Sequence, residues 1–195
     1  MTTKKGSDSS LEMLFSDLAK QVKAHAQQLP PVHLWNPKKT GDMDLFIDRE
    51  GRWIHEGREI TRPAMVKLFS RILTLEQGNF YLVTPVEKWQ IKVAVAPFII
   101  TEATRETRNS KQVICLKTKT EDPVILSSDY PIIMDSTISD GQTLPLVRVR
   151  DNLMGLISRS VFYQLVDWGD QIADASGANM LVIESMGCQF SLGEF

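Results

Sequence analysis

The chain has 195 residues, of which 43% are hydrophobic and 24% are charged, and its formal net charge is −2. A chain of this length can bury a core without disulfide bonds or a structural metal. Its nearly balanced charge provides no general attraction to nucleic acids or to anionic membrane surfaces.

The cellular compartment is predicted from the cysteines and the apolar runs. Cys115 and Cys188 lie far apart and lack the spacing of a zinc site, which indicates reduced thiols. The polar N-terminus is unlike a signal peptide, and no apolar run has the length of a membrane span. We therefore expect a cytoplasmic protein that contacts neither nucleic acid nor membrane. Its oligomeric state stays open.

Residues 1–38 are predicted to form a helix followed by a proline-rich linker. Apolar residues recur at spacings of three, four and seven, as along the buried face of a helix; they are Leu11, Leu14, Phe15, Leu18, Val22 and Ala26. Leu29-Pro30-Pro31 is expected to end this helix, because proline cannot donate the next backbone hydrogen bond. The linker contains Leu34 and Trp35, whose burial would hold the helix against the protein.

Residues 39–104 are predicted to form a β-β-α-β-β unit. Apolar and polar residues alternate over residues 42–48, as in a strand with one buried face, and residues 52–56 are predicted to form the return strand. Thr61 is a preferred helix cap, and Pro63 suits a first helical turn. The buried face of this helix is expected to consist of Met65, Leu68, Phe69, Ile72 and Leu73. The closing strands are predicted at Phe80–Thr84 and Trp89–Val95.

Residues 105–195 are predicted to form a second unit of the same kind. One strand is expected at residues 98–103, before this unit begins, and others at residues 113–117 and 124–126. Residues 127–143 are expected to be irregular because they are rich in Asp, Ser, Pro and Gly. The order strand, strand, helix, strand, strand then recurs, with strands at residues 144–150, 153–156, 180–183 and 190–192 and a helix that Ser158 caps.

These patterns predict an α+β fold with two tandem β-β-α-β-β units, mostly antiparallel sheets and an additional N-terminal amphipathic helix. The two predicted helix starts, Ile60-Thr61-Arg62 and Ile157-Ser158-Arg159, carry similar residues in the same order, which favours a structural repeat. The alternative is a pair of unrelated helix-and-sheet segments with similar capping.

Several short motifs resemble the bacterial family called domain of unknown function 1285. They run from Leu29 almost to the end of the chain: Leu29-Pro30-Pro31, Trp35-Asn36-Pro37, Gly41-Asp42, Gly51, Trp53, Arg62-Pro63, Leu68-Phe69, Leu82-Val83-Thr84-Pro85-Val86-Glu87-Lys88, Ala96-Pro97-Phe98, Val149-Arg150, Arg159 and Tyr163-Gln164-Leu165-Val166. The chain departs from the family's pattern in its N-terminal helix and in residues 127–143. The resemblance implies a cytoplasmic bacterial protein built of two similar α/β units. It implies no particular activity, and a role in signalling or ligand sensing is only conjectured for the family.

No constellation in the sequence specifies a catalytic, metal or cofactor site. The three histidines, His25, His33 and His55, have no partner at the spacing of a metal site or a hydrolytic triad. The aspartates of residues 42–48 are expected on the solvated face of a strand rather than in a cation-binding loop. Glycine-rich nucleotide loops and a GxSxG motif are absent from the sequence.

Two features are candidates for ligand binding, and each has a structural alternative. The turn Thr84-Pro85-Val86-Glu87-Lys88 is stiffened by proline and presents polar groups at the end of two strands. These groups either bind a ligand or simply solvate the turn. Arg62 and Arg159 stand at the two predicted helix starts, where a positive charge opposes the helix dipole. Each therefore either pairs with a carboxylate or helps to bind an anion.

The preferred function is a non-catalytic ligand-binding or sensory module with a role in signal transduction. Its site would bind a small anionic ligand through Arg62, Thr84, Glu87, Lys88 and Arg159. One alternative is an enzyme with a pocket between the two units, in which some of these residues act as acids and bases. The other is a protein-interaction adaptor, which an exposed patch at Trp35 or Trp168 in a homodimer would favour.

Overall fold

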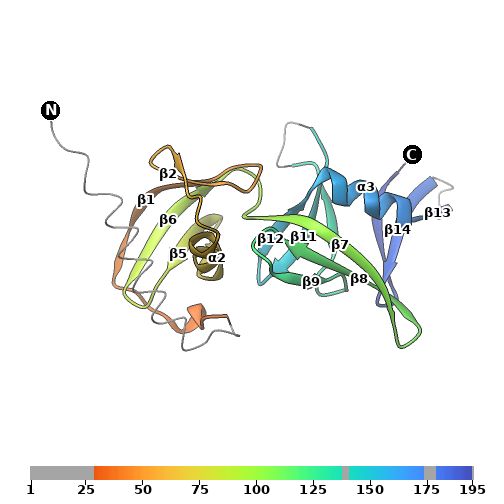
Figure 1. Cartoon of the computed structure of the whole chain (residues 1–195), viewed down its shortest axis with the longest axis horizontal. Coiled ribbons are helices and arrows are strands. Elements are labelled where there is room, and N and C mark those ends of the chain that lie inside the picture. Colours follow the sequence, from red (N-terminus) through yellow and green to blue (C-terminus); the bar gives the residue numbers. More distant parts are fainter. Residues whose placement is uncertain (1–28, 138–140, 174–178, 195) are drawn as a thin grey trace. The chain divides into compact units, whose positions relative to one another are not determined.

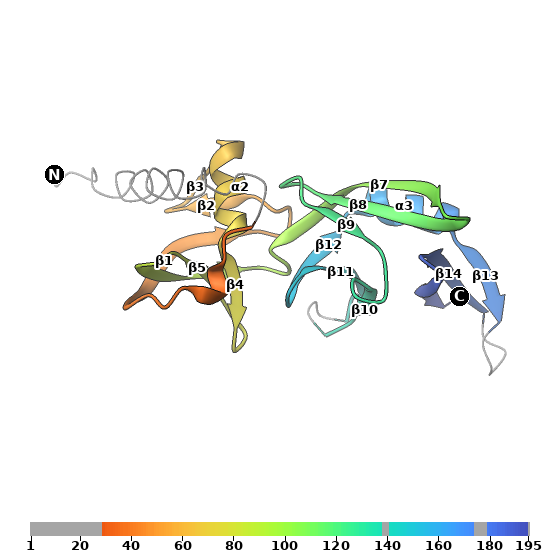
Figure 2. The same ribbon diagram turned by 90° about the horizontal axis from the view of Figure 1, so that it is seen from below.

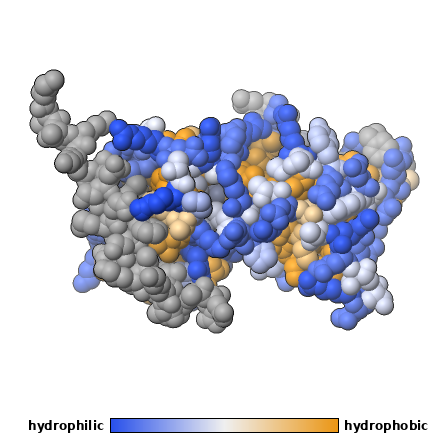
Figure 3. All heavy atoms as spheres, in the orientation of Figure 1, coloured by the Kyte–Doolittle hydropathy of each residue, from blue (hydrophilic) through white to orange (hydrophobic). Residues whose placement is uncertain are grey.

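The computed structural model describes residues 29–137, 141–173 and 179–194. Within these residues the chain divides into two compact units, one made of residues 29–46 and 53–92 and the other of residues 47–52 and 93–194. The turn at residues 47–52 thus packs with the second unit, although the strands on either side of it lie mainly in the first. Hydrophilic side chains cover much of the surface in Figure 3, with smaller apolar patches between them.

The first unit contains a six-stranded sheet and one α-helix, α2 (Figure 1). The strand order is β3-β2-β1-β6-β5-β4. Its elements are the 3-10 turn η1 (Val32–Leu34), β1 (Lys39–Ile47), β2 (Trp53–His55), β3 (Arg58–Glu59), α2 (Pro63–Arg71), β4 (Leu73–Glu76), β5 (Asn79–Val83) and β6 (Glu87–Val93). The buried side chains of α2 include Met65, Leu68 and Phe69, and the Phe69 ring lies 6.3 Å from the ring of Trp53 in β2. This contact joins the helix to the sheet.

The second unit contains a six-stranded sheet, a three-stranded sheet and the helix α3 (Figure 2). The strand orders are β10-β11-β12-β7-β8-β9 and β13-β14-β15. The elements are β7 (Phe98–Arg108), β8 (Lys111–Thr118), β9 (Pro123–Ile125), β10 (Ile132–Asp135), β11 (Leu144–Arg150), β12 (Leu153–Ile157), α3 (Arg159–Trp168), β13 (Asp170–Ala173), β14 (Asn179–Ser185) and β15 (Cys188–Glu194). Helix α3 connects the two sheets in the chain and contacts β7 of one and β14 of the other.

Ser185 joins the two sheets of the second unit through a buried hydroxyl. Its Oγ donates to the Leu126 carbonyl oxygen at 2.7 Å and accepts from the Ile114 backbone N–H at 3.0 Å. A buried polar group is tolerated when its hydrogen bonds are made, and here both partners lie outside the sheet that contains Ser185. The three-stranded sheet is therefore attached specifically to the larger one.

The predicted α+β fold of two tandem β-β-α-β-β units is wrong. The described residues form 15 strands and only two α-helices, so the protein is mostly β. In the second half, β11 and β12 belong to the six-stranded sheet, whereas β13–β15 form a separate sheet. β12 pairs in parallel with β7, which lies far upstream in the chain. Hydrophobic periodicity identifies a strand but does not identify the strand with which it pairs.

Two further predictions differ from the structure or fall outside it. Residues 127–143, predicted to be irregular, contain β10, which pairs antiparallel with β11 through Ile132 and Val147. The predicted N-terminal amphipathic helix lies outside the described residues. No helix among those described is long and apolar enough to cross a membrane.

Candidate ligand-binding site

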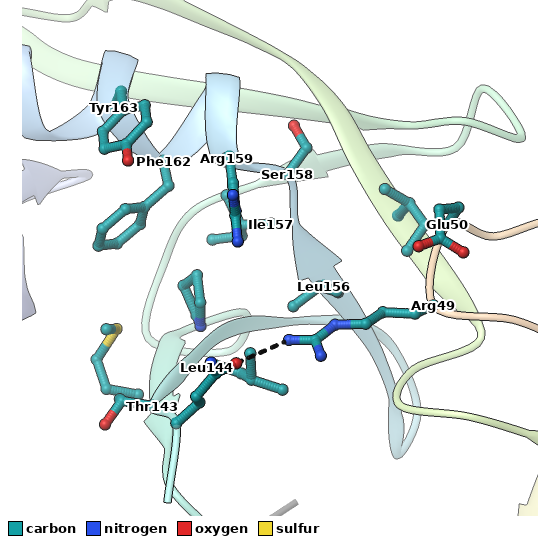
Figure 4. A pocket seen from close by; sticks show the side chains of 14 residues that line it. Arg49, Glu50, Thr143, Leu144, Leu156, Ile157, Ser158, Arg159, Phe162 and Tyr163 are labelled. Carbon is teal, nitrogen blue, oxygen red and sulfur yellow. Dashed lines mark hydrogen bonds between the residues drawn. The ribbon is translucent and has the colours of Figure 1, made fainter. Parts of the chain in front are cut away.

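A pocket of about 820 Å³ lies within the second unit, where segments distant in the sequence meet (Figure 4). Arg49 and Glu50 come from the turn at residues 47–52, and residues 142–145 come from the start of β11 and the loop before it. The longest contribution is the continuous segment from the end of β12 into the first turns of α3, which includes Ser158 and Arg159.

The floor of the pocket is apolar and is part of the core of the second unit. Ile99, Leu144 and Leu156 line the pocket and also belong to one buried hydrophobic cluster. Phe162 and Tyr163 of α3 add aromatic surface, and Tyr163 is 65% exposed. Because the floor residues are held by core packing, the pocket has a defined shape without a ligand.

Two arginines extend into the pocket from different elements. Figure 4 shows Arg159 reaching in from α3 and Arg49 reaching in from the turn at residues 47–52. Nη2 of Arg49 donates to Oε1 of Gln142 at 3.4 Å. Within the described part of the chain, Arg159 makes no ion pair with a carboxylate, and Glu50 is the acidic residue of the pocket lining. Guanidinium groups stay charged at all relevant pH values, so the pocket presents a permanent positive charge.

Asp48 determines the shape of the turn that carries Arg49. Its side chain is 9% exposed. Oδ1 accepts from the backbone N–H groups of Glu50 and Arg52 at 3.0 and 2.8 Å, and Oδ2 accepts from Nε of Arg52 at 2.6 Å. Burial disfavours the charged carboxylate, but the hydrogen bonds and the positive charge of Arg52 outweigh it. The pKa of Asp48 is therefore lowered from its ordinary value of 3.8. Asp48 thus positions Arg49 and Glu50 without lining the pocket.

Asp48→Asn is expected to lower the free energy of unfolding by about 1–3 kcal/mol at pH 7, because the charged partner of Arg52 is lost. A lowered pKa means that the stabilisation by Asp48 is present above pH 3.8 and is lost as the pH falls through the folded-state pKa. Urea unfolding at a series of pH values would measure this effect. The difference between wild type and Asp48→Asn should stay constant down to about pH 4 and shrink below it.

The control for this prediction is the exposed Asp129, whose replacement by Asn should change stability by no more than about 0.5 kcal/mol. A wild-type to Asp48→Asn difference that persists unchanged into strong acid would contradict the proposed role of the carboxylate charge.

Arg159 is held at the start of α3 by the residue before it. The Ser158 side chain accepts from the backbone N–H of Val161, which caps the helix, and the Ser158 N–H donates to the Ile100 carbonyl oxygen at 3.1 Å. The cap thereby attaches the first turn of α3 to β7. A positive side chain at this end opposes the helix dipole, so a bound anion would be favourable here.

The other sequence-predicted site residues lie in the first unit. Arg62 is the N-cap residue of α2, without a side-chain cap hydrogen bond. Thr84 is buried and closes its turn, because its Oγ1 donates to the Glu87 carbonyl oxygen and accepts from the N–H groups of Val86 and Glu87. The structure therefore brings Arg159 into the pocket and places Arg62 and Thr84 in a different unit.

Glu87 and Lys88 also have partners in the first unit. Oε1 of Glu87 lies 2.7 Å from Nζ of Lys39, and Oε2 accepts from the Trp89 indole N–H. The hydrogen bond from Lys39 and that from Trp89 outweigh partial burial and lower the pKa of Glu87 below its ordinary value. Lys88 pairs with Glu76, and its ammonium group lies 4.3 Å from the centre of the Tyr81 ring. A ligand-binding role for these residues stays a prediction.

Sequence reasoning missed Arg49, Glu50 and Phe162 as pocket residues. The predicted strands at residues 42–48 and 52–56 leave Arg49 and Glu50 in the connection between them, and Phe162 falls within the helix predicted after Ser158. The local sequence carries no signal for their convergence with Arg159, since they meet through the tertiary structure alone. The described residues contain no group of three or more His, Cys, Asp or Glu side chains that could hold a metal ion.

The structure defines a mostly β protein of two units, the second of which carries a pocket with two arginines above an apolar floor. A family model described as "Domain of unknown function (DUF1285), N-terminal domain" matches residues 30–96. A second, described as "Protein of unknown function (DUF1285), C-terminal domain", matches residues 97–192. The chain belongs to the DUF1285 family, which confirms the resemblance inferred from the sequence.

Two solved structures of family members are similar to this chain. A DUF1285 family protein from Silicibacter pomeroyi DSS-3 has 40% sequence identity and a TM-score of 0.78, over 91% of this chain and 94% of that chain. A DUF1285 family protein from Shewanella baltica OS155 has 20% identity and a TM-score of 0.51, over 64% of this chain and 91% of that chain, and shows likeness of fold alone. No curated protein matches the chain.

Proposed function

We propose that this protein is a ligand-binding module whose second unit binds a small anionic ligand in the pocket between α3, β11 and the turn at residues 47–52. One observation carries the proposal: Arg49 and Arg159, from segments far apart in the chain, extend into the same pocket. Its volume falls in the range of small-molecule sites, which is about 300–1,000 Å³.

The energetics favour an anion over a neutral ligand. Arg49 and Arg159 place two permanent positive charges in the lining of one pocket, and a bound ligand anion would offset them and form charge-assisted hydrogen bonds. The guanidinium group matches carboxylate and phosphate oxygens in a bidentate geometry. The sequence favours a sensory role for such a module. In that role, ligand binding in the pocket would serve signal transduction.

Arg159→Gln is expected to weaken anion binding tenfold to a hundredfold, because a charge-assisted hydrogen bond contributes about 1.5–3 kcal/mol. The first measurement is a thermal-shift screen with inorganic phosphate, citrate, adenosine monophosphate, benzoate and octanoate, since a ligand that binds only the folded state raises the unfolding temperature. Isothermal titration of each anion that shifts wild type would then give the dissociation constants of wild type and variants.

The matched control is Arg62→Gln, which removes an arginine at the start of the other helix. It should leave the dissociation constant unchanged, because Arg62 does not line the pocket. Both arginines are exposed, so each variant should keep its stability to within about 0.5 kcal/mol. If none of these anions shifts wild type, or if Arg62→Gln loses binding while Arg159→Gln keeps it, the proposed pocket is not the binding site.

A further inference from the structure

We infer that the ligand carries a single carboxylate on an apolar or aromatic body, and this inference rests on the proposed function. It follows from the two parts of the pocket lining, the apolar floor and the charged mouth. One ligand molecule has to complement both the apolar floor and the charged mouth.

The floor selects for an apolar body. Ile99, Leu144 and Leu156 supply aliphatic surface, and Phe162 contributes an aromatic ring to the same lining. A small, fully hydrated anion would leave this surface in contact with water or would lose its own hydration against it. An apolar body instead gains about 25 cal/mol for each Å² that it buries. The floor therefore disfavours inorganic phosphate and polycarboxylates.

The charges at the mouth select for one negative charge. Arg49 and Arg159 contribute two positive charges, and the Glu50 carboxylate in the same lining contributes one negative charge. Arg52 lies near Glu50, at 3.5 Å, but both side chains are exposed, so their pairing is weak. The lining thus has a net charge of one positive unit, which a monoanion neutralises. A dianion would bring its second charge towards Glu50, and like charges at close range repel.

Glu50 is therefore the residue that determines specificity against doubly charged ligands such as phosphate esters. It is exposed and lies on the turn, so its replacement leaves the apolar floor unchanged. Asp48, two residues earlier, forms the hydrogen bonds that shape this turn, and Glu50 takes part in them only through its backbone N–H. Glu50→Gln consequently changes the charge of the pocket while the turn keeps its geometry.

The experiment compares four probes at pH 8 by isothermal titration. Phenylacetate has both the single charge and the apolar body, acetate has only the charge, 2-phenylethanol has only the body, and phenyl phosphate combines the body with two charges. Phenylacetate is expected to bind wild type at least about tenfold more tightly than each of the others. Arg159→Gln should remove most of the preference for phenylacetate over 2-phenylethanol, because phenylacetate carries a negative charge and 2-phenylethanol does not.

Glu50→Gln provides the second measurement. It should strengthen the binding of phenyl phosphate by about fivefold to tenfold and change that of phenylacetate much less. The same variant should unfold at the temperature of wild type without ligand, which shows that the turn is intact.

The outcomes separate this inference from the proposed function. If phenyl phosphate, acetate or any polar anion of the screen binds as tightly as phenylacetate and depends on Arg159, the pocket binds anions but the monocarboxylate class is wrong. If phenylacetate, benzoate and octanoate all fail to bind while phosphate, citrate or adenosine monophosphate does, the class is wrong in the same way. If no anion binds, or if binding is indifferent to Arg159, the proposed function fails as well.

Discussion

Phe69→Ala is expected to lower the free energy of unfolding of the first unit by about 3–5 kcal/mol. Phe69 has no exposed surface, lies on the buried face of α2 and packs on the ring of Trp53 in β2. Removing the ring forfeits its transfer free energy and leaves a cavity between the helix and the sheet. A loss of this size is comparable to the whole stability of a small unit.

Urea denaturation followed by circular dichroism and by tryptophan fluorescence would measure this loss. The control is Phe46→Ala in β1, which removes the same side chain at a position that is 36% exposed. It should cost no more than about 1 kcal/mol, the span of strand propensities. Equal losses for the two variants would mean that Phe69 does not join the helix to the sheet as the structure indicates.

Gly51→Ala is expected to destabilise the second unit by about 2–5 kcal/mol and to weaken ligand binding. Gly51 has φ +68, and a Cβ added there would lie 2.5 Å from Cγ1 of Ile99. An alanine in this left-handed conformation costs about 1–2 kcal/mol, and overpacking a core costs about 1–3 kcal/mol more. Ile99 is β-branched, buried and part of the pocket floor, so it cannot easily rotate away.

The chain supplies a matched control in Gly141, which belongs to the same unit. Gly141 has φ +82, but a Cβ at that position meets nothing within 4 Å. Gly141→Ala should therefore show only the backbone cost of about 1–2 kcal/mol. Chemical denaturation of both variants would isolate the clash with Ile99 as the difference between them. If Gly141→Ala is as destabilising as Gly51→Ala, the close approach of the turn to Ile99 has no energetic importance.

The sequence predicted helix α2 well because its signals are local. Pro63 and the spacing of Met65, Leu68 and Phe69 lie within about three turns of chain, and the structure contains a helix at Pro63–Arg71 with those three side chains buried. The predicted ends of the helix differ from the structure, because Arg62 and not Thr61 is the N-cap residue, and Ile72 and Leu73 lie beyond the last helical residue. The helix that begins after Ser158 was found in the same way. Its capping hydroxyl accepts from the N–H of Val161, as a helix cap does.

The candidate site could be predicted only in part, because only one of its two arginines has a signal in its local sequence. Arg159 was recognised because an arginine at a helix start is locally unusual. Arg49 lies in an ordinary turn about a hundred residues earlier, and its sequence neighbours do not indicate that it faces α3. The residue types of the Thr84–Lys88 turn made it a candidate for ligand binding. In the structure its polar groups instead interact with one another and with Lys39, Glu76 and Trp89 of the first unit.

The sequence by itself determined where many strands and two helices lie and which side chains of α2 are buried, since period-2 and period-3.6 patterns arise from the chain's own geometry. It also determined the family to which the chain belongs. Only the tertiary structure decided that β12 pairs with β7, that β13–β15 form a separate sheet, and that Arg49 and Arg159 line one pocket. Strand pairing and pocket formation depend on which apolar surfaces bury one another across long stretches of chain, and local patterns do not encode that choice.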